Sequence, residues 1–274
     1  MKNNIRRFLF YFFITVLLVV WLFPLLFIVL TSIKSPDEFY TKQMLSLPSS
    51  IFWQNFYLAW TRANLQKYIA NGLLVSIIKV PLGILVEALA AFALSRLDID
   101  KNNRIFMFFL VGMMIPMQVT LVGINYAYSR LGLVNTYHGL IYVYIGFGIP
   151  FGILVLRGFF RTIPVELDES ARIDGCSNFT LFWRILLPVA KPAVASLIIL
   201  DSLSTWNEFL IASILMTNDN MRTIPAGLLN FFGEFGTDYS LLSAGVIISI
   251  IPVLLIYFLF QKYFVEGMSG AVKG

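Results

Sequence analysis

The chain has 274 residues, of which 58% are hydrophobic and 13% are charged. Soluble globular domains are about 45 to 50% apolar and about 25% charged, so the composition excludes an ordinary soluble domain and predicts a membrane protein. The net charge of +5 comes from basic residues scattered at the borders of apolar stretches, a pattern that excludes the clustered basic face of a nucleic-acid-binding protein.

Six apolar stretches are long enough to cross a bilayer core of about 30 Å, which takes about 20 residues per helix. They cover residues 8–31, 68–95, 105–128, 137–156, 192–216 and 241–264. The first is too long for the apolar part of a secretory signal peptide, and no A-x-A-like site follows it. We therefore expect an all-α membrane protein with six transmembrane helices.

The distribution of Lys and Arg predicts the orientation of these helices, because cytoplasmic loops carry the excess of positive charge. With the N-terminus inside, thirteen of the twenty basic residues fall in inner segments, six fall in outer segments, and Lys79 lies within a span. Both termini are therefore predicted to be cytoplasmic. The outer segment 34–67 carries an aromatic run, which we interpret as an anchor at the lipid headgroups.

Polar side chains within the spans are costly in lipid unless they are paired or hydrated. Lys79 and Glu87 are two helical turns apart in the second span, too far for direct contact, so we expect partners on other helices. A second set of polar side chains lies in the third and fifth spans: Gln118, Asn125, Asp201, Asn207 and Glu208. They either line a translocation path or contribute to helix packing, and the sequence leaves both alternatives open. Gly148 and Gly152 have the small-xxx-small spacing of tightly packed helices.

The inner segment 157–191 contains a short charged helix, predicted over residues 164–175. Pro164 suits its first turn, acidic residues complement the positive end of its dipole, and Gly175 is placed to end it. Asp168 and Glu169 are spaced to pair with Arg172 on the helix surface. From these residues alone the helix is either a solvated connector or a docking element.

The same segment resembles the EAA loop, E-A-A-x3-G-x9-I-x-L-P, of permease subunits in bacterial ABC importers. Glu169, Gly175 and the run 185–188 match this pattern, and Ser170 replaces its second residue. Stretches 221–240 and 262–274 are similar to the carbohydrate-importing branch of that family. The resemblance implies residues that couple transport to the ATPase: Glu166, Asp168, Glu169, Ser170, Ala171, Arg172, Asp174 and Gly175.

The resemblance further implies the ABC type I importer fold, with a single permease domain over 1–274, a cytoplasmic coupling helix at 164–175 and a cytoplasmic tail at 266–274. The implied partners are a second, homologous permease, two ATPase subunits that bind ATP and Mg²⁺, an extracytoplasmic solute-binding protein, a sugar and the lipid of a bacterial cell membrane. This chain would hold no cofactor or metal itself.

The sequence contains no G-x-x-x-x-G-K-[ST] stretch and so lacks the backbone cradle and lysine that hold nucleotide phosphates. It also lacks H-E-x-x-H and G-x-S-x-G, so no hydrolase site is indicated and we expect a transport subunit without enzyme activity. The alternative is a secondary carrier coupled to an ion gradient, which would leave the EAA-like segment unexplained. A requirement for a separate ATPase chain distinguishes the two.

Overall fold

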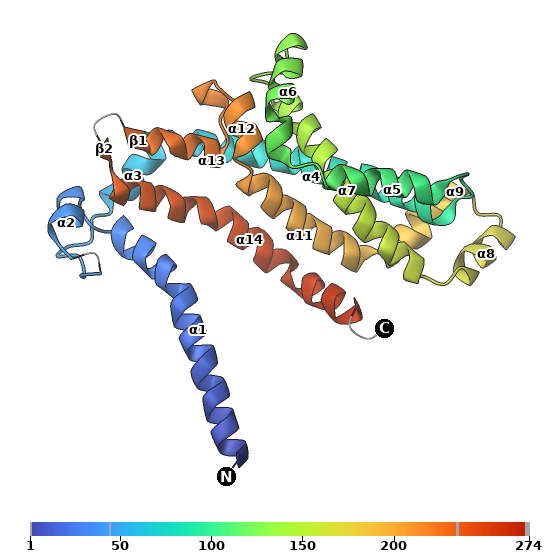
Figure 1. Cartoon of the computed structure of the whole chain (residues 1–274), viewed down its shortest axis with the longest axis horizontal. Coiled ribbons are helices and arrows are strands. Elements are labelled where there is room, and N and C mark those ends of the chain that lie inside the picture. The colour runs from blue at the N-terminus through green and yellow to red at the C-terminus, as the bar shows by residue number, and fades with distance from the viewer. Residues whose placement is uncertain (1, 44, 234–235, 272–274) are drawn as a thin grey trace. The chain divides into compact units, whose positions relative to one another are not determined.

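The computed structural model describes residues 2–43, 45–233 and 236–271. The described chain is almost entirely helical, as predicted, with one short antiparallel pairing between β1 (Phe232–Gly233) and β2 (Gly236–Thr237) (Figure 1). It divides into two compact units, one made of residues 1–66 and 227–251 and the other of residues 67–226 and 252–274. Helix α14 (Tyr239–Ala271) has its two halves in different units.

The first unit contains α1 (Lys2–Ser32), α2 (Pro36–Thr41), α3 (Gln54–Thr61) and a single 3₁₀ turn, η3 (Leu228–Phe231). No residue is buried in the most apolar 18-residue window of α1, as expected of a helix that is solvated by lipid. Asn55 on α3 is buried and donates hydrogen bonds of 2.8 Å to the carbonyls of Ser32 and Lys34, which fixes α3 to the end of α1.

The second unit contains the remaining helices. In chain order they are α4 (Leu65–Arg96, beginning two residues before the unit), α5 (Asn102–Met113), α6 (Met117–Arg130), α7 (Tyr137–Thr162), α8 (Glu166–Ile173), α9 (Asn178–Thr180), the π-helical turn η1 (Leu181–Leu186), α10 (Leu187–Val189), α11 (Lys191–Asn207), α12 (Leu210–Leu215), η2 (Asp219–Met221) and α13 (Ile224–Gly227).

The main apolar core of this unit lies between α4, α7, η1 and α11. Ala88 and Phe92 of α4 pack there with Phe160 of α7 and Leu186 of η1. A second cluster joins the other half of α7 to α12 and α13. These two clusters hold α4, α7 and α11 in fixed positions around the polar groups described below.

Four helices in the described chain are long and apolar enough to cross a membrane: Ile5–Ser32, Leu65–Arg96, Tyr137–Thr162 and Tyr239–Lys262. Two further candidates are bent pairs, α5 with α6 at 93° and residues 178–189 with α11 at 75°. Counting each bent pair as one span gives the predicted six.

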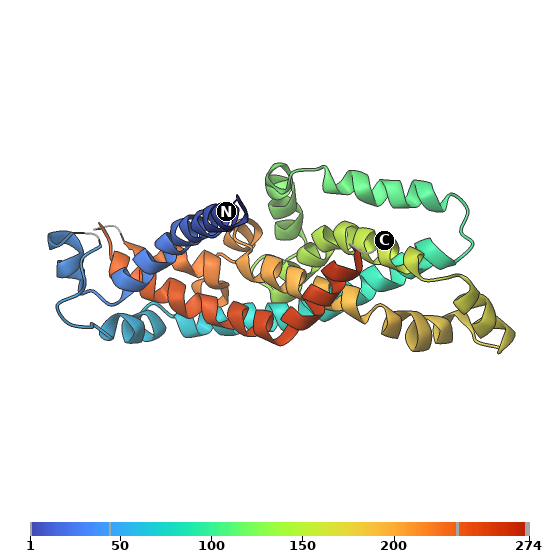
Figure 2. The same cartoon turned by 90° about the horizontal axis from the view of Figure 1, so that it is seen from below.

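The first bent pair differs from the straight run expected over 105–128, and the 75° break of the second pair lies before the run expected over 192–216. Pro116 explains the first break, because proline disfavours helical geometry at the residue before it, and Figure 2 shows α5 and α6 meeting nearly at a right angle. The second run ends early: α11 stops at Asn207, Glu208 is extended, and α12 starts at Leu210.

Candidate functional site

Helix α8 has defined signals at both ends. Pro164 precedes it, and the amide of Asp168 bonds to the carbonyl of Val165 at 2.9 Å in its first turn. Gly175 follows the helix with φ at +81°, a conformation in which glycine avoids the steric cost that other residues incur. The amide of Cys176 then bonds to the carbonyl of Ala171 at 2.9 Å, the hydrogen bond of a Schellman motif.

The two faces of α8 differ in burial. Asp168 and Ala171 point inward, with Asp168 only 4% exposed. Its other candidate coupling residues are exposed: Glu166, Glu169, Ser170 and Arg172, with Asp174 and Gly175 just beyond the helix end. Ile173 is 86% exposed beside them, an apolar side chain without cover from the described chain. An exposed surface that combines charge with uncovered apolar groups is typical of a protein contact site.

The inward face of α8 is held by a buried ion pair that the sequence did not predict. Asp168 Oδ2 lies 3.3 Å from Arg96 Nε at the end of α4, and both side chains are nearly fully buried. The predicted pairing of Asp168 with Arg172 is therefore wrong, because the carboxylate of Asp168 is buried against Arg96 while the side chain of Arg172 is exposed. Glu169 does not pair with Arg172 within the described residues either, and Arg172 donates to Asn178 Oδ1 at 3.3 Å.

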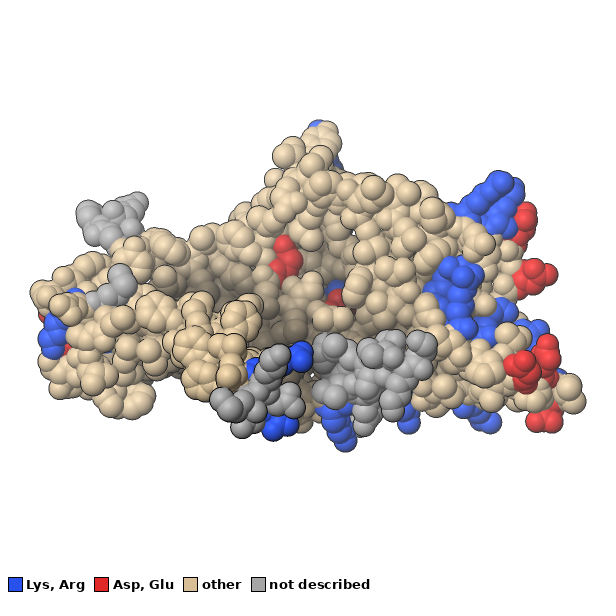
Figure 3. Space-filling model, turned by 60° about the horizontal axis from the view of Figure 1, so that its bottom comes forward, with Lys and Arg blue, Asp and Glu red and all other residues tan. Residues whose placement is uncertain are grey.

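Arg96 also joins α4 to the end of α7. Its guanidinium donates to the carbonyls of Phe160 and Ile163, each at 2.7 Å, in the last turn of α7 and at its cap. Arg157 makes the reciprocal link, from α7 to the carbonyl of Leu94 at 3.0 Å. Three elements thus meet at one end of the second unit, where the charged side chains visible in Figure 3 gather. A displacement of α8 would therefore be transmitted to α4 and α7.

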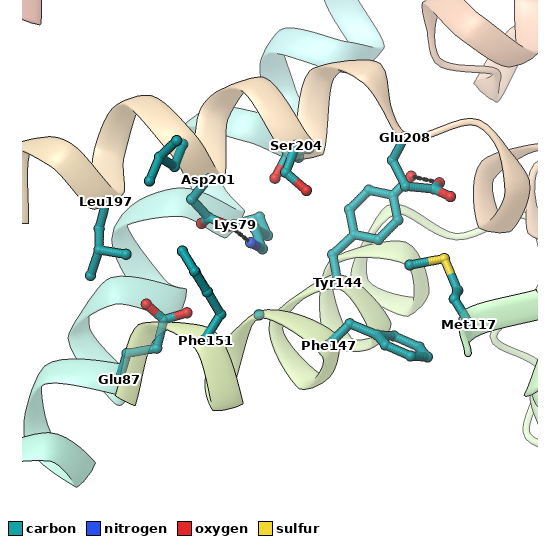
Figure 4. A pocket seen from close by; sticks show the side chains of 13 residues that line it. Lys79, Glu87, Met117, Tyr144, Phe147, Phe151, Leu197, Asp201, Ser204 and Glu208 are labelled. Atoms are coloured by element: carbon teal, nitrogen blue, oxygen red, sulfur yellow. Dashed lines mark hydrogen bonds and ion pairs between the residues drawn. The ribbon is translucent and has the colours of Figure 1, made fainter. Parts of the chain in front are cut away.

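A second candidate site is a cavity of about 290 Å³ between α4, α7 and α11. Lys79 of α4 forms an ion pair with Asp201 of α11, so the expectation that Lys79 meets a partner on another helix is confirmed. Glu87, two turns further along α4, also points into the cavity (Figure 4). Tyr144, Phe147 and Phe151 form its aromatic wall on α7.

Glu208 lies at the end of this cavity where α11 has unwound. Its carboxylate accepts hydrogen bonds from the amides of Ile211 and Ala212, at 2.8 and 3.0 Å, and thereby satisfies the first turn of α12. The hydroxyl of Tyr144 donates to the same carboxylate at 2.6 Å. Glu208 therefore lines the cavity with both of its carboxylate oxygens already hydrogen-bonded.

The structure brings Asp201 and Glu208 to the cavity but not the other three predicted path residues. Gln118 and Asn125 are exposed on α6, which the break after α5 turns aside, and neither lines the cavity. Asn207 is exposed and donates to the carbonyl of Leu203 at 2.9 Å. Their assignment to a path stays a prediction.

Sequence reasoning missed the polar cavity residues Tyr144, Ser204 and Thr205, because none of them stands out in an apolar run. The signal that was available is the pair Gly148 and Gly152. A Cβ atom added to Gly148 would lie 3.2 Å from Glu87 Oε1 and 3.3 Å from Lys79 Nζ, and one added to Gly152 would overlap the Glu87 carboxylate. These glycines make room for charged side chains as well as for a neighbouring helix.

At the opposite end of the second unit from α8, hydrogen bonds connect the loop that follows α12 to the starts of α4 and α7. Asn71 donates to the carbonyls of Asn220 and Arg222 at 2.9 Å and accepts from the hydroxyl of Tyr137 at 2.8 Å. No group of three or more His, Cys, Asp or Glu side chains among the described residues is placed to hold a metal ion.

Similarity to known proteins covers most of the chain. The profile of the family described as "Binding-protein-dependent transport system inner membrane component" matches residues 79–270. A probable ABC transporter permease protein of Bacillus subtilis, YurM, is 39% identical over 253 residues, which cover 92% of this chain and 84% of that protein. The probable starch degradation products transport system permease protein AmyC of Thermoanaerobacterium thermosulfurigenes is 33% identical over 273 residues, 99% of each chain.

Among solved structures, one chain of a bacterial ABC transporter involved in the import of the acidic polysaccharide alginate has a similar fold. The TM-score is 0.85 with 22% identity, and the match covers 96% of this chain and 98% of the other.

Proposed function

This chain belongs to the family of binding-protein-dependent transport system inner membrane components, and we propose that it is the permease subunit of an ATP-driven importer for a sugar. It is a transport component and not an enzyme, and it crosses the membrane several times. The names of its relatives support an oligosaccharide: starch degradation products for AmyC, and melibiose, raffinose and stachyose for MelC of Bacillus subtilis, which is 30% identical over 253 residues.

The observation that carries this proposal is the construction of α8. The helix exposes Glu169 and Ile173 outward while Asp168 anchors its inner face to Arg96. A helix that is rigidly attached to two membrane helices and presents a mixed charged and apolar surface is suited to receive force from a partner. In this proposal the partner is one of two ATPase subunits, which bind ATP and Mg²⁺ on their own residues.

The rest of the assembly follows from the same proposal. A second, homologous permease completes the path, an extracytoplasmic binding protein delivers the sugar to the loop over 217–240, and both termini lie in the cytoplasm. One membrane domain spans the chain, the coupling helix covers 164–175, and the tail 266–274 reaches toward the ATPases. The last three residues of that tail lie outside the described residues. ATP binding moves α8, and the cavity opens to alternate sides of the membrane.

A pull-down of this chain from its native membrane in detergent tests the proposal. The co-purifying chains are identified, and ATP hydrolysis is assayed with and without maltotriose, raffinose and diacetylchitobiose. A second permease, an ATPase and sugar-stimulated hydrolysis are expected. A chain that purifies without an ATPase would contradict the proposal and favour the carrier coupled to an ion gradient.

A further inference from the structure

The cavity between α4, α7 and α11 contains a carboxylate whose bonding the fold does not explain. Glu87 is 2% exposed and lines the cavity, yet within the described chain it has no hydrogen bond and no ion pair. A buried carboxylate without a partner costs several kcal/mol, and more in a membrane helix than at a protein surface. A ligand that donates hydrogen bonds into the cavity would satisfy this carboxyl group.

Two further acceptors face the same space. Asp201 Oδ1 is bound by Lys79, but Asp201 Oδ2 is buried without a hydrogen-bond partner in the described structure. Thr205 is 7% exposed, and its hydroxyl is also without a partner among the described residues. Glu87, Asp201 and Thr205 come from two helices and converge on one cavity, so they provide a built set of acceptors and not a chance cluster of acids.

The charge of the cavity restricts what it accepts. Three carboxyl groups, those of Glu87, Asp201 and Glu208, face one cation, Lys79, so the lining has an excess of acidic groups. Anionic ligands are repelled by this excess. A metal ion is not favoured either, because no three acidic side chains in the described residues are placed to hold one. Uncharged groups with many hydroxyl donors fit these acceptors best.

The shape of the cavity points the same way. Its volume of about 290 Å³ lies at the lower end of small-molecule sites, which are about 300 to 1,000 Å³, and matches one ring more closely than a whole oligosaccharide. Tyr144, Phe147 and Phe151 line the α7 side and offer faces on which the apolar side of a sugar ring stacks (Figure 4). The polar acceptors are contributed by the other two helices.

We infer that this cavity is a subsite for one uncharged sugar ring in transit, with Glu87, Asp201 and Thr205 accepting its hydroxyl hydrogens. The inference rests on the proposed function and adds to it a selectivity against acidic sugars. It also assigns substrate contact to this permease subunit itself, at residues that neither the family profile nor the names of the relatives specify.

The test measures sugar binding to the purified transporter complex in nanodiscs without the binding protein, by saturation-transfer difference NMR. The probes are maltotriose and raffinose, which are uncharged, and trigalacturonate, which is acidic. Glu87→Gln and Thr205→Val keep the side-chain shape but weaken the acceptor. Ser76→Ala and Ser202→Ala are the matched controls, because each alters a buried hydroxyl on the same helix that does not line the cavity.

We expect the uncharged trisaccharides to bind equally well to the wild-type complex and to both controls. Their binding to Glu87→Gln and Thr205→Val should be about tenfold weaker. Trigalacturonate should not bind. Undiminished binding of the uncharged sugar to both variants overturns the subsite. Trigalacturonate binding of equal strength also overturns it.

ATP-driven uptake is measured on the same preparations with the binding protein added, so that the two claims fail separately. If the complex takes up sugar with ATP, but the variants bind the sugar as strongly as the wild type does, the subsite is overturned and the proposed importer stands. Sugar binding that Glu87→Gln abolishes, without ATP-driven uptake in the wild type, overturns the importer and leaves the subsite.

Discussion

Asp168 of α8 and Arg96 of α4 form a buried ion pair, with 3.3 Å between Asp168 Oδ2 and Arg96 Nε. Arg96 also binds two carbonyls at the end of α7. One guanidinium therefore connects the helix that carries the EAA-like sequence to two helices that line the membrane cavity. In the proposed importer this is the route by which ATPase closure reaches the cavity.

Asp168→Asn is expected to leave Arg96 charged and buried without its counterion, a loss of about 3 to 5 kcal/mol at a buried pair. We expect the sugar taken up per ATP hydrolysed to fall at least about tenfold. The measurement is uptake and hydrolysis on the same proteoliposomes. Asp98→Asn, at an exposed carboxylate just beyond the end of α4, is the control and should leave the ratio unchanged.

The double variant Asp168→Asn, Arg96→Gln separates the ion pair from general damage. With both charges removed, the destabilisation should be smaller than the sum of the single effects. Additive losses in thermal unfolding of the complex would mean that the two residues act independently.

Ile173→Asp introduces a charge on the uncovered apolar position of α8. Because Ile173 is 86% exposed, the fold should tolerate the change, while an apolar contact with the ATPase should be lost. We expect ATPase recovery in a pull-down to drop about tenfold. Leu131→Asp, at an exposed apolar residue after α6, should have no effect; equal recovery with both variants would show that α8 is not the docking helix.

Gly175→Ala places a Cβ at a φ of +81°, which costs a residue with a side chain about 1 to 2 kcal/mol, and Gly175→Pro is incompatible with that angle. Both variants should disrupt the turn that ends α8, and proline should do so more severely. Uptake should fall while the chain remains inserted in the membrane. Gly158→Ala is the control, because its added Cβ meets nothing within 4 Å. Normal uptake by Gly175→Pro would contradict a mechanical role for this turn.

Gly152→Ala would force its Cβ into the space of the Glu87 carboxylate, whereas Gly146→Ala meets open space. Overpacking of this kind costs about 1 to 3 kcal/mol, so the melting temperature of the complex should fall for Gly152→Ala only. If the two alanine variants melt alike, Glu87 is not packed against Gly152 and the geometry of the cavity is incorrect.

The helical fold was predictable because apolar run length dominates in lipid, and the end of α8 was predictable because Gly175 is a local signal. The breaks at Pro116 and Glu208 were not foreseen. Both follow from single residues inside apolar runs, where a count of hydrophobic residues does not detect an unwound turn.

The candidate site was predictable only in part. Asp201 and Glu208 were recognised because charges are rare in spans, and both line the cavity. The partner of Asp168 was assigned to its own helix, because sequence spacing describes neighbours on one helix surface and contains no information on the α4 residue that packs beneath it. Thr205 was missed because threonine is unremarkable in an apolar run. Its hydroxyl is a candidate ligand contact only because it is buried without a hydrogen-bond partner in the described structure.

The central claim is tested most directly by uptake of a radiolabelled uncharged trisaccharide into proteoliposomes that contain the reconstituted complex, energised either by ATP or by an ion gradient. The account predicts uptake with ATP alone, and its loss in Glu169→Lys, an exposed change on α8 that leaves the chain inserted. Uptake driven by the gradient without ATP, or normal ATP-driven uptake by Glu169→Lys, would contradict it.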